Sequence, residues 1–550
     1  MVDKRRKKKS LSIVLAAAMC VPLMMPANTL ASNEPIPQNF SWDDPGPTSP
    51  VLHPGSSTGA GMVSEPLNNI NDFMEDMIEQ SVMPGAVTFI ARKGHIVHNE
   101  AYGHSYLYED DQFNETEQPI QTETDTIFDI ASLSKLFTTT AAMTLYEDGH
   151  FDLDDPVAKY IPEFATNDKE DITIRQLMTH TSGFPAWIPL HSQGDTREDR
   201  LQIVYEQELS TEPGTDYTYS DLNMITLGSL VERLSGQRLD EYVKEAITKP
   251  LGMSDTMYNP PEELKHRIAA TEYQPLVNRG LVWGEVHDEN AWSLDGISGH
   301  AGVFSTAEDL GKFAHMFLND GQYGGKRILQ EETVDLMLES QIPELADQGL
   351  GFEFDRGSFM GALSSESTFG HTGFTGTSLV VNQDNATIAI LLTNRVHPSR
   401  DTTSTHVARR ALAEQVADAI PVSMPSDEAW FSGYGDQAEY ELTADLNLAE
   451  DAILTFDTWH RIEEGYDFGY VEFSEDSNDW MTAYELTGDE NWHEIEIEIP
   501  ETAQKIRFTY ETDALVNGRG WYIDNTQLTT LNGEIIDLNW TSSDWVQRSY

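Results

Sequence analysis

The sequence predicts an α+β domain, in which a central antiparallel sheet is flanked by helices, followed by a C-terminal all-β sandwich. Two observations lead to this prediction. Strand-like segments lie at both ends of residues 64–420 and helical segments lie between them, as in a sheet assembled from both ends of a domain. Residues 421–550 instead hold many short segments in which apolar and polar residues alternate with period two, the pattern of antiparallel strands.

The N-terminus has the pattern of a secretory signal peptide. Basic residues at positions 4–9 precede an apolar run at 11–25, and Ala31 offers a small side chain at the expected cleavage site. The run is shorter than the roughly 18–20 residues that a membrane-spanning helix needs, so we expect cleavage rather than a transmembrane anchor. Residues 1–31 are therefore predicted to be a signal peptide, and the mature protein to be secreted, in solution or associated with the cell wall.

Composition excludes several classes of function. The net charge of −58, from 34 basic and 92 acidic residues, disfavours binding to nucleic acid and to anionic membranes. We interpret it as adaptation to a salty or alkaline exterior, with calcium binding as an alternative. The one cysteine, Cys20, lies in the predicted signal peptide, so the mature chain has no disulfide and no thiolate metal site. Lipidation of Cys20 stays open, although the bulky Met19 disfavours it.

The mature chain divides into three regions, the last of which is the predicted β-sandwich of residues 421–550. Residues 32–63 are rich in proline and glycine and show little apolar periodicity, so we expect a linker or a loosely packed arm. Residues 64–420 would form the first domain, with one strand hairpin near each end. Its expected elements are a helix from Leu67, strands at 85–92 and 95–102, strands at 377–381 and 386–393, and a closing helix at about 405–420.

Ser132 and Lys135 are the first candidate catalytic pair. Strand- or loop-like residues 128–131 precede them, and residues 136–146 read as a buried helix. Residues three apart share a helix face, so the Ser132 hydroxyl can meet the Lys135 amine. We expect burial to lower the pKa of the lysine so that it acts as a neutral base. The alternative is a helix-capping serine and a surface lysine, so other motifs have to decide.

Two further motifs follow. Tyr219 lies in a loop before a second apolar helix, where its phenol could shuttle the serine proton, and Asp221 is a plausible cap for that helix. The glycine-rich residues 370–376 lie directly before the second hairpin, and glycines there allow the backbone to approach a ligand closely. The alternatives are an aromatic residue packed at a loop and a turn with an incidental histidine, His371.

In this order and at these intervals, Ser132-x-x-Lys135, Tyr219-x-Asp221 and His371-Thr372-Gly373 resemble the serine penicillin-recognising superfamily. The branch is that of class C β-lactamases, DD-peptidases, related esterases and D-amino-acid amidases. Segments 171–183 and 299–310 are similar to the same family. The resemblance covers about residues 64–420 and implies a β-lactamase/transpeptidase-like fold, an α/β sandwich around an antiparallel sheet.

The resemblance also implies the catalytic roles. Ser132 would attack a carbonyl carbon while Lys135 and Tyr219 exchange its proton, and His371 would complete the catalytic set. The backbone N–H groups of Ser132 and, by position, Phe374 would form the oxyanion hole. An acyl-enzyme would form and water would release it, with no cofactor.

Two departures from the family pattern leave the substrate open. Asp221 stands where many members have asparagine, and its ionised carboxylate cannot donate to a substrate amide. His371 stands where β-lactamases usually have lysine, and histidine is mostly neutral at pH 7. A histidine there is familiar from DD-peptidases and D-amino-acid amidases, so peptide chemistry stays open. We expect Asp221, Thr372 and Gly373 to line the substrate site.

His287 and Asp288 are also expected to shape substrate choice. Together with His180, His300 and Glu289 they could suggest zinc, but their spacing fits no compact ligand motif. We therefore expect hydrogen bonding or cleft lining from these residues and predict no metal site.

Residues 421–550 hold 7 of the 11 tryptophans, and 29 acidic against 5 basic side chains. Segments 454–459, 469–474 and 520–525 are similar to the jelly-roll module of secreted peptidases of the immune inhibitor type. Tryptophans can stack on sugars, but core packing explains most of them, so glycan contact is the lesser alternative. Whether the acidic region binds a metal ion stays open.

The sequence thus predicts a secreted serine hydrolase of cell-wall-derived peptides, of the DD-carboxypeptidase or of the muramyl-peptide or D-amino-acid amidase type. Its partners would be small peptides, amides or esters, including peptidoglycan fragments. A carboxylesterase or a weak class C-like β-lactamase is the alternative in chemistry. An inactive cell-wall-binding protein is the alternative in class.

Overall fold

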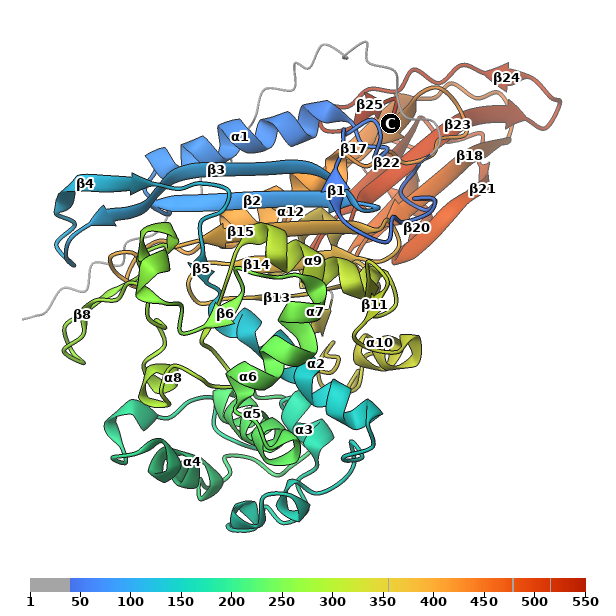
Figure 1. Cartoon of the computed structure of the whole chain (residues 1–550). Coiled ribbons are helices and arrows are strands. Elements are labelled where there is room, and N and C mark those ends of the chain that lie inside the picture. Colours follow the sequence, from blue (N-terminus) through green and yellow to red (C-terminus); the bar gives the residue numbers. More distant parts are fainter. Residues whose placement is uncertain (1–39, 355, 477–478, 515) are drawn as a thin grey trace, which may run out of the picture. The chain divides into compact units, whose positions relative to one another are not determined.

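The computed structural model describes residues 40–354, 356–476, 479–514 and 516–550 (Figure 1). The predicted signal peptide, with Cys20, lies outside the described residues. Among the described residues, no helix combines the length and the apolar character that crossing a membrane would require.

An antiparallel sheet assembled from both ends of the first region confirms the predicted fold class. Strand β2 (Gly85–Arg92) pairs with β3 (His95–Tyr108) on one side and with β15 (Thr387–Thr393) on the other. The eight-stranded sheet has the order β1-β3-β2-β15-β14-β13-β12, with β4 beside β3, and only the β1–β3 pair is parallel. Its other strands are β1 (His53–Pro54), β4 (Glu115–Gln121), β12 (Glu353–Phe354), β13 (Thr368–Thr372) and β14 (Ser378–Asn382).

Helices cover both faces of this sheet (Figure 1). The apolar residues at odd positions of β2 belong to one core with α2 (Ser134–Glu147) and α9 (Ala307–Leu318), whereas those at even positions belong to another with α1 (Ser64–Glu79) and α12 (His406–Asp418). This alternation is the period of a strand that is buried on both sides. The two predicted hairpins, the first helix and the closing helix are all present.

The residues between the two halves of the sheet form helices and short strands that carry most of the candidate site. The α-helices are α3 (Ile174–Met178), α4 (Arg197–Tyr205), α5 (Asp221–Ser235), α6 (Leu239–Val243), α7 (Lys249–Leu251), α8 (Glu289–Ser293), α10 (Glu331–Met337) and α11 (Gly357–Met360). The 3₁₀ turns are η1 (Ala131–Leu133), η2 (Val157–Lys159), η3 (Pro162–Phe164), η4 (Leu190–Ser192), η6 (Glu262–Arg267) and η7 (Gly361–Leu363), and η5 (Lys244–Thr248) is a π-helical turn. The short strands are β5 (Phe128–Asp129), β6 (Met257–Tyr258), β7 (Tyr273–Gln274), β8 (Gly280–Leu281), β9 (Val303–Ser305), β10 (Gln322–Tyr323) and β11 (Lys326–Arg327).

Residues 40–63 differ from the predicted linker or loosely packed arm. Trp42 is only 1% exposed and meets Trp459 of the C-terminal region edge-to-face. The buried Arg92 guanidinium donates to the main-chain carbonyls of Phe40, Ser41, Ala60 and Gly61. Because these contacts are made by backbone carbonyls rather than by a periodic apolar face, the composition of the segment gave no sign of them.

Two antiparallel sheets form the C-terminal region and enclose an apolar core. One has the order β21-β18-β23-β16-β25 with β24 beside β23, and the other has the order β17-β22-β19-β20. Its similarity to a jelly-roll module and its contact with glycans stay predictions. The strands are β16 (Ala429–Phe431), β17 (Glu439–Asp445), β18 (Ala452–Arg461), β19 (Phe468–Ser474), β20 (Met481–Leu486), β21 (Asp489–Ile499), β22 (Lys505–Glu511), β23 (Gly520–Thr530), β24 (Ile535–Ile536) and β25 (Val546–Arg548).

Candidate active site

Ser132 lies in the 3₁₀ turn η1, directly before α2, which begins at Ser134. The preceding Ala131 has φ 48°, in the left-handed region that costs a non-glycine residue roughly 1–3 kcal/mol. The Asp129 carboxylate, 2% exposed, accepts the Ala131 N–H at 2.8 Å and stabilises this turn. Burial raises the pKa of Asp129. No sequence motif indicates this role for Asp129.

Lys135 meets Ser132 as predicted, but its charge differs from the prediction. Its Nζ lies 3.0 Å from Ser132 Oγ, 2.9 Å from Asp221 Oδ1 and 3.2 Å from the His300 carbonyl oxygen. Burial lowers the pKa of Lys135, but the Asp221 carboxylate and the Tyr219 phenol raise it by more, so the net shift is upward. Three acceptors therefore surround an ammonium ion with three protons. The expected neutral lysine base is wrong for this resting structure.

The sequence suggested that Asp221 caps α5, but it does not. Its carboxylate is therefore free to pair with Lys135. Ser220 takes the capping position, and its hydroxyl accepts the Leu222 N–H at 3.2 Å. Asp221 then begins the helix, and its partly buried carboxylate turns to the lysine. Its nearest charged partner is thus Lys135, which the family resemblance alone did not indicate.

Tyr219 lies against Lys135, with the ammonium 4.7 Å from the centre of its ring. Burial raises the pKa of the phenol, Lys135 lowers it and Asp221 raises it again, so the net shift is upward. The Tyr219 ring also neighbours the rings of His180 and His371, at centroid distances of 4.9 and 5.8 Å. The structure therefore brings the three predicted motifs to one place.

His180 contacts the loop that carries Tyr219. It is 2% exposed, and its Nδ1 accepts the Ser220 N–H at 3.1 Å. Burial, followed by the charge of Lys135, holds the pKa of His180 well below its usual value, so the ring is neutral. This positioning of the residue next to Tyr219 agrees with a hydrogen-bonding role rather than a zinc ligand.

His371 is neutral in the structure, as expected from its residue type. It is 3% exposed on β13, and burial lowers its pKa although Glu353 opposes the shift. Its Nδ1 lies 2.7 Å from the Thr372 carbonyl oxygen, so Nδ1 carries the proton and donates. No fixed cation therefore stands at this position to meet a substrate carboxylate.

Gly373 allows two segments of the site to approach closely. A Cβ atom at this position would lie 2.5 Å from the Ile130 carbonyl oxygen and 2.1 Å from the Thr377 hydroxyl oxygen, too close for any other residue. The next residue, Phe374, has a ring that is 50% exposed. Within the described part of the chain, the N–H groups of Ser132 and Phe374 donate to no other group. Both amides are therefore available to an oxyanion.

Asp288 and His300 form a pair behind Asp221. His300 Nε2 lies 2.8 Å from Asp288 Oδ1, and the same oxygen accepts the Ala291 N–H at 2.7 Å as the N-cap of α8. Among the described residues, Asp221, Asp288 and His300 place ligand atoms within 4.8 Å of one another, as a metal site would. In this structure the cation beside Asp221 is the ammonium of Lys135.

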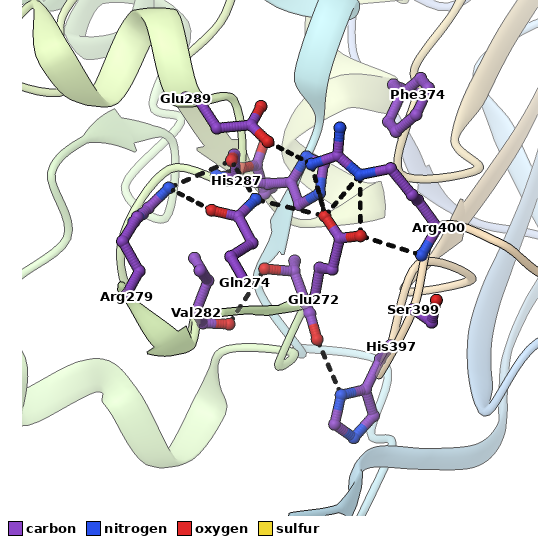
Figure 2. Close-up of polar contacts among 12 residues, drawn as sticks. Glu272, Gln274, Arg279, Val282, His287, Glu289, Phe374, His397, Ser399 and Arg400 are labelled. Atoms are coloured by element: carbon purple, nitrogen blue, oxygen red, sulfur yellow. Dashed lines mark hydrogen bonds and ion pairs between the residues drawn. The ribbon is translucent and has the colours of Figure 1, made fainter. Parts of the chain in front are cut away.

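His287 is only 3% exposed, and of its two predicted roles, hydrogen bonding and cleft lining, the structure shows the first. Its Nε2 lies 2.8 Å from the carboxylate of the buried Glu272, which Arg400 also contacts (Figure 2). A local motif could not have indicated Glu272 or Arg400, since they come from distant loops.

Beside Tyr219, an open groove of about 600 Å³ is lined by Tyr217, Tyr219, Glu353, Arg356 and residues 343–347.

Comparisons with known proteins agree with this geometry. The family model named Beta-lactamase matches residues 70–414. A relative from Escherichia coli (strain K12), named "Putative D-alanyl-D-alanine carboxypeptidase", is 34% identical over 381 residues, which are 63% of this chain and 86% of the relative. A relative of the same name from Salmonella schwarzengrund (strain CVM19633) is 31% identical over 379 residues, covering 63% of this chain and 87% of the relative.

Solved structures show the same fold. A penicillin-binding protein homologue from Caulobacter crescentus aligns with a TM-score of 0.52 and 16% identity, over 65% of this chain and 99% of its own. EstCE1, described as a hydrolase with promiscuous acyltransferase activity, aligns with a TM-score of 0.51 and 22% identity, over 64% and 98% of the two chains. At these identities the likeness concerns the fold alone.

Proposed function

We propose, from the premise that this chain belongs to the β-lactamase family of serine hydrolases, that it is an exported enzyme that cleaves cell-wall-derived peptides. The observation that carries the proposal is the contact of Lys135 with both Ser132 and Tyr219 in a partly open site. The named activity of the relatives favours a DD-carboxypeptidase. An amidase acting on muramyl peptides or D-amino-acid amides uses the same acyl transfer.

The catalytic step follows from the charges of the site. Ser132 Oγ attacks the substrate carbonyl carbon, and its proton passes to Tyr219 or Lys135 once that group has released its own proton to solvent, because both carry a proton in the resting structure. The oxyanion that develops is stabilised by the backbone N–H groups of Ser132 and Phe374. The leaving amine takes up the proton, and water later attacks the acyl-enzyme by the reverse route.

At His371 the substrate side of the site lacks a fixed cation, and Arg356 is the arginine that lines the groove beside Tyr219. His371 is neutral, Lys135 is paired with Asp221, and Arg400 is paired with Glu272. Recognition of a substrate carboxylate by a fixed lysine, the usual arrangement of β-lactamases, is therefore absent at His371. This feature supports a weak rather than a rapid reaction with β-lactams.

A carboxylesterase is the second candidate, because an ester substrate needs no cation for a terminal carboxylate. The same shortage of free positive charge at His371 favours it over a β-lactamase. Peptide and ester substrates thus differ in whether they carry a charged group, and a substrate panel can separate them.

The deciding experiment is a hydrolysis assay of the purified mature chain on muropeptides, D-amino-acid amides, short esters and nitrocefin. We expect turnover of a peptide or amide substrate, slow nitrocefin hydrolysis, and no turnover by Ser132→Ala. Turnover of esters alone would select the esterase instead. Hydrolysis of no substrate in the panel by the folded chain would favour the inactive binding protein. Export would be checked by N-terminal sequencing of the secreted protein, which should begin at Ser32.

A further inference from the structure

A polar cluster, made by the buried Glu272 and His287 and the partly exposed Glu289 and Arg400, lies beside Phe374 (Figure 2). Glu272 is 6% exposed, and its carboxylate accepts from His287 Nε2 at 2.8 Å and from Arg400 Nε at 2.7 Å. Arg400 also pairs with Glu289. Burial raises the pKa of Glu272, but His287 and Arg400 lower it to about 2, so the carboxylate is ionised. Because an ionised carboxylate only accepts, His287 Nε2 carries the donated proton.

The main chain of His287, like its ring, is hydrogen-bonded to neighbouring side chains. Gln274 and Arg279 donate to its carbonyl oxygen at 3.0 and 3.2 Å. Its N–H donates to the second oxygen of Asp129 at 2.7 Å. The other oxygen of Asp129 accepts the N–H of Ala131, the residue before the nucleophile. His287 is therefore fixed on three sides and contacts the carboxylate that stabilises the Ser132 turn.

The ring of His287 reaches the other half of the oxyanion hole. It stacks on the Phe374 ring, with centroids 5.7 Å apart and planes inclined by 21° (Figure 2). The Phe374 ring is half exposed, so His287 supports it from the protein side while Arg395 and Arg400 lie 5.4 and 5.6 Å from its centre. The hydroxyl of the next residue, Thr375, also donates to the Asp129 carbonyl oxygen at 2.7 Å.

We propose that His287 is a positioning residue of the oxyanion hole, which, anchored by Glu272, holds the Asp129-capped turn of Ser132 and the ring of Phe374 in one arrangement. The inference rests on the proposed function, since it assumes that these two backbone N–H groups meet an oxyanion. Donors stabilise an oxyanion only at hydrogen-bond distance, so a small shift of either segment lowers the rate of acylation. Substrate binding is not expected to change, because the proposal concerns only the two N–H groups that meet the oxyanion.

The test measures the rate constant kinact and the binding constant KI for a fluorophosphonate probe. In His287→Ala we expect kinact to fall by about tenfold or more, with KI within about twofold of the wild-type value. His287→Gln keeps an N–H that can donate to Glu272 and should recover part of the rate. Phe374→Ala removes the exposed half of the stack and should give a smaller loss of kinact.

Leu531→Ala is the matched control, because this 67% exposed side chain lies in the C-terminal region and should leave both constants unchanged. If His287→Ala does not fold, Phe374→Ala, at an exposed position, decides alone. Unchanged kinact in Phe374→Ala and in any folded His287→Ala, or a loss confined to KI, would overturn the proposal. Undiminished labelling of Ser132→Ala would instead overturn the proposed function, and the oxyanion hole with it.

Discussion

Two buried clusters of opposite charges, one in the candidate site and one at the start of the C-terminal region, differ in what surrounds them. In the site, Lys135 pairs with Asp221 and also contacts the Ser132 hydroxyl. At the second cluster, Asp418 of α12 accepts from Arg548 at 2.8 Å and lies 3.5 Å from Arg519.

Aromatic rings enclose the second cluster. Arg519 lies 5.1 and 5.5 Å from the ring centres of Phe431 and Tyr522, and Arg548 lies 4.0 Å from that of Phe431. The cluster thus includes the phenol of Tyr522, and Tyr434 lies against Asp418, but these contacts include no serine hydroxyl. A buried, charge-paired cation is therefore common to the candidate site and the second cluster. The serine hydroxyl of Ser132 beside the Lys135 ammonium distinguishes the candidate active site from the second cluster.

Asp418→Asn should give the largest effect of the two substitutions that test this comparison. Removing one partner of a buried pair leaves two arginines without their carboxylate, and we expect about 3 kcal/mol lower free energy of unfolding at pH 7. Burial raises the pKa of Asp418, but Arg548 and Arg519 lower it by more. The stabilisation is therefore present above the ordinary pKa of an aspartate and lost as the pH falls through the lower value of the folded state.

Urea unfolding of the wild-type chain and the variant, at pH 7 and at acid pH, checks this prediction. The difference between them should shrink as the pH falls, and turnover per folded molecule should not change. A loss of turnover without a loss of stability would show that the second cluster takes part in catalysis and would break the comparison.

Asp221→Asn should give a smaller effect, and one on activity rather than on stability. The Asp221 carboxylate raises the pKa of Lys135 and of Tyr219, so its removal makes the basic form of either group available at lower pH. We expect the rising limb of the kcat/KM profile to move to lower pH by about one to two units. Lys135→Ala, as the control, should be inactive across the profile. An unmoved limb, or one that moves to higher pH, would contradict the assigned charges.

Sequence reasoning predicted the candidate active site because its members occur in motifs with fixed order, and the structure brings these residues together. Ser132 and Lys135 are three residues apart, and Tyr219 and His371 follow in glycine-rich or turn-rich segments that a sequence reader can recognise. The antiparallel sheet was also predictable, because apolar strands with turn residues between them mark both hairpins. These features depend on neighbours in the chain.

The parts that could not be predicted depend on contacts between distant residues. The charge of Lys135 follows from Asp221, 86 positions away, and that contact exists because Ser220 caps the helix instead. Glu272 and Arg400 are 128 positions apart and belong to no motif. Trp42 lies in a segment whose proline content suggested a linker, yet its ring packs against a strand of the C-terminal region.

The claim that Ser132 is the nucleophile can be tested by peptide mapping with mass spectrometry, after reaction with a fluorophosphonate or a penicillin probe. We expect a covalent adduct on the peptide that contains Ser132, with fragmentation placing the added mass on that residue, and no adduct in Ser132→Ala. An adduct on another residue, or none on a folded wild-type chain, would contradict it.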